Sequence, residues 1–268
     1  MIWRSVARRL VVIAVIGLFV APVSGLVGVL TRSPEPTRLW ALMVGPAAAS
    51  FRSGLGVQLS VAGIGTVAMT TAVVAAAYGL SLLKGRTLRV LIVGLIIPMV
   101  ISGGIIPTYV VVRWLGLIDR PAVLVLAERI DVVMILALHA VFGSEPIRSL
   151  REAAAVDGAA PITVMTRVAI PAGAHPVVAV AVLSALRFWN AWFPAFLFVH
   201  SPELRPAQNV LRSLAATAGH LRGAESVRGL SAAGEAGIAL YALILLLPGL
   251  ALVFLVRKLV GTALSIRH

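Results

Sequence analysis

Long apolar segments constrain the fold of this chain more than any other feature of its sequence. Hydrophobic residues make up 60% of the 268 residues and charged residues only 12%, whereas soluble domains carry roughly 25% charged residues. A helix that crosses a bilayer needs about 20 mostly apolar residues. Segments of this kind fall at residues 10–30, 57–83, 87–112, 121–142, 171–199 and 237–260. We therefore predict an all-α integral membrane protein with six transmembrane helices.

The charge balance is strongly basic, with a formal net charge of +13. The arginines are scattered through the predicted loops instead of gathering on one face with aromatic residues, so nucleic-acid binding is not expected. We interpret the basic residues as charge at a lipid surface. Cysteine is absent, which excludes disulfides and thiolate metal sites. The dispersed histidines do not form a metal-binding pattern either: His139, His175, His200, His220 and His268.

The first apolar segment follows a basic amino terminus, residues 1–9, and resembles a signal peptide in that respect. At residues 10–30 it is longer than a signal core of about 7–15 residues and lacks a clear cleavage site, so we expect an uncleaved first helix. Six spans place both termini on one side. The modest excess of Lys and Arg in the loops on that side favours a cytoplasmic location for the termini.

A polar island, Arg151–Pro171, interrupts the apolar pattern between the fourth and fifth predicted spans. Its first part has helix-forming residues, Gly158 supplies a stop, and Pro161 suits the first turn of a second short helix. The alanines of the island would let another protein approach closely. The alternative is a small-residue hairpin that only packs under the helix bundle.

Several motifs resemble permease subunits of bacterial binding-protein-dependent ABC importers. Glu152-Ala153-Ala154 with Asp157-Gly158, and then Val168-Ala169-Ile170-Pro171, resemble the EAA loop of that family. Residues 102–109 (SGGIIPTY), 114–119 (WLGLID) and 189–193 (WNAWF) resemble the maltose-type sugar permeases, and the oligosaccharide branch in particular. Together the matches extend over residues 57–260. Val168 and Ile170 depart from the usual isoleucine and leucine, and Pro146 stands one residue early.

The resemblance implies a type I importer permease in the bacterial plasma (inner) membrane. Its coupling loop, residues 144–171, would join a core at 57–260 to the ATPase; residues 1–56 would form the first helix and outer loop, and 261–268 a cytoplasmic tail. Expected partners are a second permease, two ATP-binding subunits that hold ATP and magnesium, and an external solute-binding protein that delivers a sugar or oligosaccharide. This chain would bind no cofactor itself. The residues implied in ATPase coupling are Glu152, Ala153, Ala154, Asp157, Gly158 and Pro171.

Charged residues inside predicted spans are costly, so they suggest a function. Glu128, Arg129 and Asp131 fall in the fourth span and Arg187 in the fifth. Three interpretations stay open: an internal ion pair, a polar lining for the sugar path, or an outer-interface position. Aromatic and amide side chains could stack on and hydrogen-bond a sugar ring, or serve as core anchors. The candidate substrate-path residues are therefore Glu128, Arg129, Asp131, Arg187, Trp189, Asn190 and Trp192.

Other function classes have little support in the sequence. No GxxxxGK[ST] segment is present for nucleotide phosphates, and no GxSxG or HExxH motif indicates a hydrolase. We therefore do not expect an enzyme. A stand-alone secondary transporter, driven by ions through Glu128 and Asp131, would leave the polar island unexplained. An importer permease for a non-sugar solute would keep the island. Pro98 and Pro107 predict a break in the third span.

Overall fold

The computed structural model describes residues 23–25, 27–28, 31, 46–101, 103–221 and 238–251. Helices dominate these ranges, and no β-strand occurs within them. The predicted all-α class is confirmed. Most of the first apolar segment and all of the predicted tail, 261–268, lie outside the described residues. The chain divides into two compact units, residues 1–56 with 205–250 and residues 57–204 with 251–268.

The first unit contains the start of α3 (Pro46–Ser81), α13 (Ala207–Leu221) and most of the helix Ile238–Ala251. Phe51 stacks on Tyr241 with ring centroids 4.2 Å apart. A Cβ at Gly54 would lie 3.0 Å from backbone atoms of Ala207, so this glycine permits close helix contact. These contacts join α3 to both later helices of the unit.

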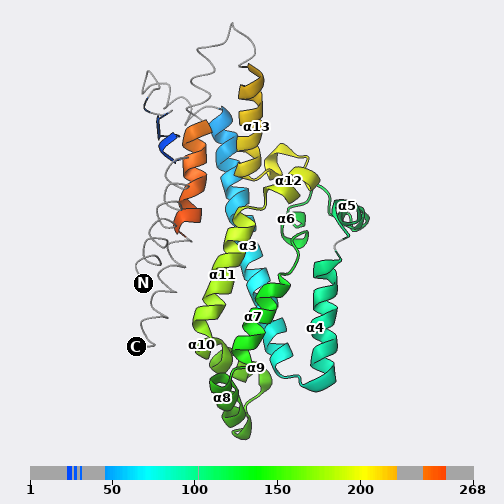
Figure 1. Ribbon diagram of the computed structural model, residues 1–268. Coiled ribbons are helices and arrows are strands. Elements are labelled where there is room, and N and C mark those ends of the chain that lie inside the picture. Colours follow the sequence, from blue (N-terminus) through cyan, green and yellow to red (C-terminus); the bar gives the residue numbers. More distant parts are fainter. Residues whose placement is uncertain are drawn as a thin grey trace, which may run out of the picture. The chain divides into compact units, whose positions relative to one another are not determined.

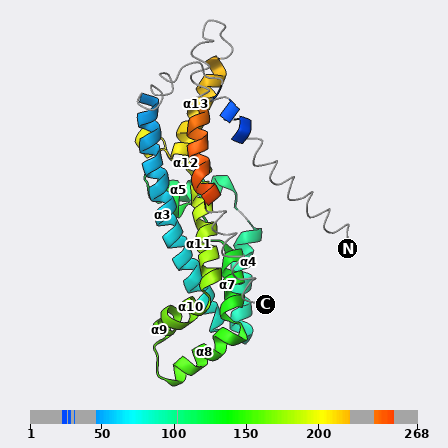
Figure 2. The ribbon, with the colours of Figure 1, turned by 90° about the vertical axis from the view of Figure 1, so that its left-hand side faces the viewer.

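The second unit holds the remaining elements (Figure 1). α3, α7 and α11 lie side by side, while α8 and α9 lie at one end of this unit and α5, α6 and α12 at the other (Figures 1 and 2). Its elements after α3 are α4 (Gly85–Val100), α5 (Ile105–Trp114), α6 (Val123–Leu126), α7 (Val132–Phe142), α8 (Glu145–Val156), α9 (Pro161–Val164), η1 (Met165–Ala169), α10 (Ile170–Ala172), α11 (Ala174–Trp189), α12 (Trp192–Phe198) and η2 (Pro202–Leu204).

The core of the second unit is apolar and tightly packed. Leu124, Leu138, Phe142 and Phe188 are almost wholly buried. A Cβ at Gly65 would come within 2.5 Å of the Phe188 ring, so α3 and α11 meet closely because this residue has no side chain. Elsewhere α3 exposes large apolar side chains that suit lipid or another subunit better than water.

Among the described residues, one helix is long and apolar enough to cross a membrane by itself, and up to four spans result if each sharply bent helix pair counts as one. The third predicted span breaks between Val100 and Ile105 instead of at its prolines. Gly104 has φ +78° there, a backbone conformation that glycine adopts readily. Pro107 lies in the first turn of α5, where its missing N–H costs little.

The fourth and fifth predicted spans are not single helices. In the fourth, α6 ends at Leu126 and α7 begins at Val132. The Asp131 side chain accepts from the N–H groups of Val133 and Met134 and so starts a new helix. In the fifth, α11 ends at Trp189 and α12 begins at Trp192. The expectation of one helix per segment was therefore wrong for both, and the count of six spans stays a prediction.

Candidate functional site

The polar island folds as the predicted helix, turn and helix, here called the α8–α9 hairpin (residues 145–164). Gly158, with φ +75°, follows the end of α8. Its N–H donates to the carbonyl of Ala155 at 3.1 Å, and the N–H of Ala159 donates to the carbonyl of Ala154 at 3.1 Å. This pair of bonds is a Schellman motif, which satisfies the last carbonyls of a helix and reverses the chain. α8 begins earlier than expected, at Glu145.

The hairpin presents most of its surface to the outside. Glu152, Ala153, Asp157 and Gly158 are exposed, while Ala154 is half-buried. The sequence prediction emphasises small side chains. The structure adds large apolar ones, because Leu150, Val156 and Ile162 are all exposed, with Val156 at 88%. An exposed apolar group beside charges is typical of a protein-binding surface.

Charges on α8 pair along the helix. Arg148 Nε lies 2.9 Å from Glu152 Oε1 and Arg148 Nη1 lies 3.8 Å from Glu145 Oε2. The hydrogen bond from Arg148 and then its charge lower the pKa of the Glu152 carboxyl, and the same hydrogen bond raises the pKa of Arg148. Both groups remain open to solvent, so the pair orders side chains without closing the surface.

Arg151 fastens the hairpin to other helices of the second unit, and this role was not predicted. Its Nη1 donates to Ser81 Oγ at 2.6 Å, at the end of α3, and to the Phe142 carbonyl at 3.1 Å, at the end of α7. The guanidinium also lies 5.6 Å from the centre of the Tyr78 ring. Tyr78 in turn donates through its hydroxyl to the Pro161 carbonyl at 3.3 Å. We call this set the Arg151 clamp; it connects the hairpin to the ends of α3 and α7.

After α9 the chain widens into a π-helical turn, η1, before Pro171 in α10. Proline lacks an N–H and crowds the carbonyl four residues earlier, and short π segments accommodate such disruption and often occur at functional sites. Pro171 is exposed. The last residue of the predicted coupling set thus lies on the chain leading from the hairpin into α11.

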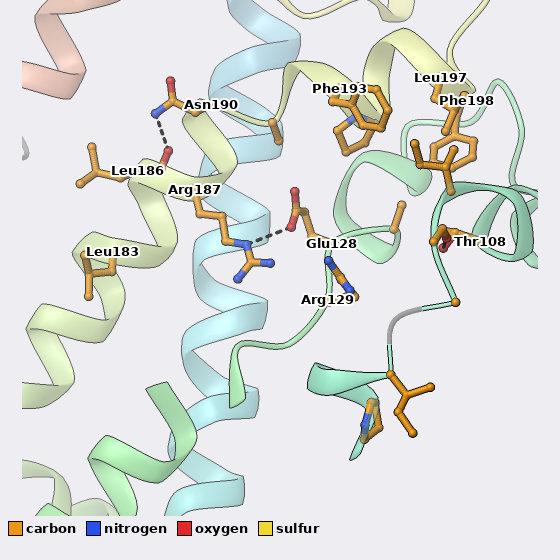
Figure 3. Close-up of a pocket in the computed structure, with 18 residues that line it drawn as sticks. Thr108, Glu128, Arg129, Leu183, Leu186, Arg187, Asn190, Phe193, Leu197 and Phe198 are labelled. Atoms are coloured by element: carbon orange, nitrogen blue, oxygen red, sulfur yellow. Dashed lines mark hydrogen bonds and ion pairs between the residues drawn. The ribbon is translucent and has the colours of Figure 1, made fainter. Parts of the chain in front are cut away.

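A cavity of about 970 Å³ lies toward the other end of the second unit, among α5, the α6–α7 connection, α11 and α12. Figure 3 shows Thr108, Glu128, Arg129, Arg187 and Asn190 around it. Apolar walls come from Leu183, Leu186, Phe193, Leu197 and Phe198. Its size and its mixture of apolar surface with few polar groups are those of a small-molecule site.

Arg187 joins α11 to the segment between α6 and α7. Its Nε lies 2.9 Å from Glu128 Oε2, and its Nη1 lies 3.0 Å from Asp131 Oδ2 (Figure 3 marks the Glu128 contact). The internal ion pair left open by the sequence is therefore present. It does not exclude the second interpretation, because Arg187 and Glu128 also line the cavity.

A second cavity of about 600 Å³ adjoins the same cluster, with walls from α3, α4 and α7. Pro98, Arg129 and Arg187 line both cavities, whereas Glu128 lines the first and Asp131 the second. Arg187 is therefore exposed to both cavities, and each cavity also holds one of the two carboxylates that it bonds.

The aromatic candidates occupy different places. Trp189 is buried, and its carbonyl accepts from the amide of Gln58. Trp192 packs edge-on against Phe193 with ring centroids 5.5 Å apart. Neither tryptophan lines a described cavity, whereas Asn190 and Phe193 line the larger one. Sequence reasoning missed Phe193 as a lining residue, although it stands within the WNAWF motif.

The WLGLID segment forms a tight connection within the second unit. Asp119 has φ +58°, and its carboxylate accepts from the N–H groups of His200 at 3.0 Å and Ser201 at 2.8 Å and from the Ser201 hydroxyl at 2.5 Å. The hydrogen bond from the Ser201 hydroxyl is the main cause of a lowered pKa of Asp119. These bonds hold the loop after α5 against the chain that follows α12.

Comparison with known proteins finds three relevant curated relatives. The chain is 34% identical over 167 residues to Protein LplC of Bacillus subtilis, covering 62% of this chain and 56% of that protein. It is 30% identical over 156 residues to a polygalacturonan/rhamnogalacturonan transport system permease protein, YtcP, of the same organism, covering 57% and 53%. It is 34% identical over 164 residues to a putative ABC transporter permease protein of Streptomyces antibioticus, covering 60% and 65%. The first two matches span little more than half of the relatives' length.

A solved structure shares the fold. The structure of a bacterial ABC transporter involved in the import of the acidic polysaccharide alginate matches with a TM-score of 0.74, 20% identity and 94% coverage of this chain and 96% of that one. No family model matches the sequence. The resemblance to sugar-importer permeases that the sequence motifs predicted is confirmed by these relatives.

Proposed function

We propose that this chain is a permease subunit of an ATP-driven ABC importer in the bacterial plasma membrane. It would pair with a second permease around a shared path for a sugar or oligosaccharide. Two ATP-binding subunits, which hold ATP and magnesium, would sit beneath the two permeases, one of them docked on the α8–α9 hairpin, and an external solute-binding protein would deliver the cargo. This chain would form the path and contribute no ATPase site.

The observation that carries the proposal is the attachment of an exposed hairpin to the ends of α3 and α7. Glu152, Ala153 and Gly158 face outward, while Arg151 bonds to the ends of α3 and α7. A docked ATPase that moves the hairpin would therefore also move these helices, because the Arg151 clamp transmits displacement. Exposed apolar groups such as Val156, beside the charges of α8, supply a surface that a docked subunit could cover.

A saccharide cargo is supported by the cavity and by the cargo of similar proteins. Flat apolar side chains in the cavity suit the apolar faces of pyranose rings, and Asn190, Glu128 and Arg187 can bond hydroxyls. YtcP is named for polygalacturonan and rhamnogalacturonan transport, and the similar structure belongs to an alginate importer. The same proposal includes a permease core bounded by residues 57 and 260, six spans surrounded by membrane lipid, and cytoplasmic termini.

The test is affinity purification of the tagged protein from solubilised membranes, followed by identification of the chains that accompany it. We expect an ATP-binding subunit and a second permease. Gly158→Pro is the matched variant: residue 158 has φ +75°, which proline cannot adopt, so the hairpin should deform and the ATP-binding subunit should be lost while membrane insertion persists.

The alternatives predict other results. Purification of an active homo-oligomer without an ATPase would replace the proposal with a secondary transporter. Recovery of the ATPase together with uptake of a peptide or another non-sugar solute would keep the importer and change the cargo. Normal uptake by Gly158→Pro and by Glu152→Lys would remove the hairpin from the coupling mechanism.

A further inference from the structure

We propose that Arg187 forms a binding site for a sugar carboxylate, so that the saccharide carried is acidic, and that Glu128 occupies this site in its absence. The inference rests on the proposed transport of a saccharide and adds the chemical class of the cargo and the residues that select it. Four observations support it. Two carboxylates bond Arg187, the two carboxylates differ in their other hydrogen bonds, Arg187 lines two cavities, and apolar side chains line the larger cavity.

The two carboxylates occupy different parts of one guanidinium. Glu128 bonds Nε, and Asp131 bonds Nη1. Nε lies on the side edge of the guanidinium, which can bind a carboxylate with two parallel hydrogen bonds. Because Glu128 bonds Nε and also lines the larger cavity, a sugar carboxylate entering this cavity could replace Glu128 while Asp131 keeps its bond.

Asp131 and Glu128 also differ in the hydrogen bonds that they make besides the one to Arg187. The Oδ1 atom of Asp131 caps α7 by accepting from the N–H groups of Val133 at 2.9 Å and Met134 at 3.2 Å. Asp131 is therefore held in place by this cap as well as by its bond to Arg187. Glu128 lies in the non-helical stretch between α6 and α7. Its bond to Arg187 can be exchanged without uncapping a helix.

The location of Arg187 suits a residue that binds the cargo during its passage. Its side chain is 30% exposed and lines both cavities, so a group bound to it can be reached from either hollow. A guanidinium inside a predicted span is costly and requires compensation. Glu128 and Asp131 supply that compensation when the path is empty, and the sugar carboxylate would supply part of it during passage.

The rest of the larger cavity fits a sugar acid. Its volume of about 970 Å³ is at the upper end of common ligand pockets, roughly 300–1,000 Å³. Leu183, Leu186 and Phe193 are among the residues that line this cavity (Figure 3). Such walls can contact the apolar face of a pyranose ring while its carboxylate bonds the guanidinium.

The experiment measures binding of radiolabelled trigalacturonate, and of its methyl ester, to the protein purified in detergent with its accompanying chains and without ATP. The ester has the same rings without the charge. We expect the acid to bind more tightly than the ester, and Arg187→Gln to weaken binding of the acid by roughly tenfold or more, since it removes a charge-assisted contact. Binding of the ester should change little.

Glu128→Gln provides the decisive opposite result. It nearly preserves the shape of the side chain but removes the carboxylate that competes for Arg187, so binding of the acid should become several-fold tighter. Arg113→Gln is the control, because Arg113 is an exposed arginine on α5 that does not line either described cavity. If Arg187→Gln fails to fold, Glu128→Gln still tests whether Arg187 binds the sugar carboxylate.

Equal binding of acid and ester, no detectable binding of the acid, or weaker binding by Glu128→Gln would overturn the inference. These results would leave the proposed import function standing if the ATP-binding subunit still co-purifies and sugar uptake continues. Conversely, acid binding without any co-purifying ATPase would refute the importer and keep the carboxylate site.

Discussion

Two arginine–carboxylate clusters in this chain have similar bond lengths and different surroundings. On α8, Arg148 bonds Glu152 at 2.9 Å, with side chains 44% and 62% exposed. Between α11 and the α6–α7 connection, Arg187 bonds Glu128 at 2.9 Å, with side chains 30% and 16% exposed. The first pair joins residues on one helix, and the second joins segments far apart in the sequence.

The difference separates a pair on an accessible surface from a cluster in which charges compensate one another out of full contact with water. Water screens the Arg148 pair, so it contributes little to stability and leaves the hairpin accessible to a partner. Around Arg187 the lower exposure strengthens electrostatic interaction and makes an unpaired charge costly. Each of the following substitutions alters either the Arg187 cluster or the α8–α9 hairpin.

The largest expected effect is on stability, from Arg187→Met. It leaves Glu128 and Asp131 without their shared cation, and breaking a buried pair costs about 3–5 kcal/mol; partial exposure reduces our expectation to about 2–3 kcal/mol. Arg148→Met is the matched substitution on α8 and should leave the midpoint of thermal unfolding nearly unchanged. Thermal unfolding of the two purified variants measures the contrast, and equal shifts would contradict it.

Arg151→Ala should separate coupling from stability. The variant removes the bonds to Ser81 and to the Phe142 carbonyl, so the hairpin would move without moving α3 and α7. We expect sugar uptake to fall on the order of tenfold, since bonds from a charged donor are lost, while the ATPase subunit still co-purifies. Arg148→Ala, which leaves the Arg151 clamp intact, should retain uptake. Loss of uptake in both variants would show that charge on α8 matters instead of the clamp.

Gly158→Ala should produce a smaller, local effect. Residue 158 has φ +75° with open space where a Cβ would lie, whereas helical Gly79 on α3 has equal space and no positive φ. A left-handed conformation costs a side-chain-bearing residue about 1–2 kcal/mol. Hydrogen exchange at residues 153–159 should accelerate in Gly158→Ala, and Gly79→Ala should show no such change. Unchanged exchange in Gly158→Ala would contradict the strain argument.

The α8–α9 hairpin was largely predictable because its signals are local. A run of alanines favours a helix, Gly158 ends it, and Pro161 suits the start of the next one. The structure confirms all three features. Only the beginning of α8 was missed, since Glu145 and Pro146 belong to a first turn that the motif does not include.

The cluster around Arg187 was predictable in composition but not in geometry. Its partners lie 59 and 56 residues away, and the Arg151 bond to Ser81 spans 70 residues, so neither follows from spacing. Hydropathy over a span averages across charged residues and cannot place a break. The cap by Asp131 that divides the fourth segment was therefore missed, as was the separation of α11 from α12.

The smallest expected effect is that of Glu152→Gln, which tests whether the exposed pair serves docking or stability. The pKa of Glu152 is lowered by the hydrogen bond from Arg148, so its contribution to stability is present above the ordinary carboxyl value of 4.5 and is lost as pH falls through the lowered folded value. The midpoint of thermal unfolding of Glu152→Gln should therefore lie slightly below that of the native protein near neutral pH, because an exposed pair contributes little, and should converge with it in acid.

Co-purification of the ATP-binding subunit with Glu152→Gln supplies the other half of that test. If Glu152 contacts the partner, the variant should retain less of the subunit at neutral pH although its thermal unfolding is nearly unchanged. Added salt should also weaken retention in the native protein, because exposed charges are screened. Full retention at every salt concentration would assign Glu152 to ordering Arg148 and leave docking to exposed apolar residues such as Val156.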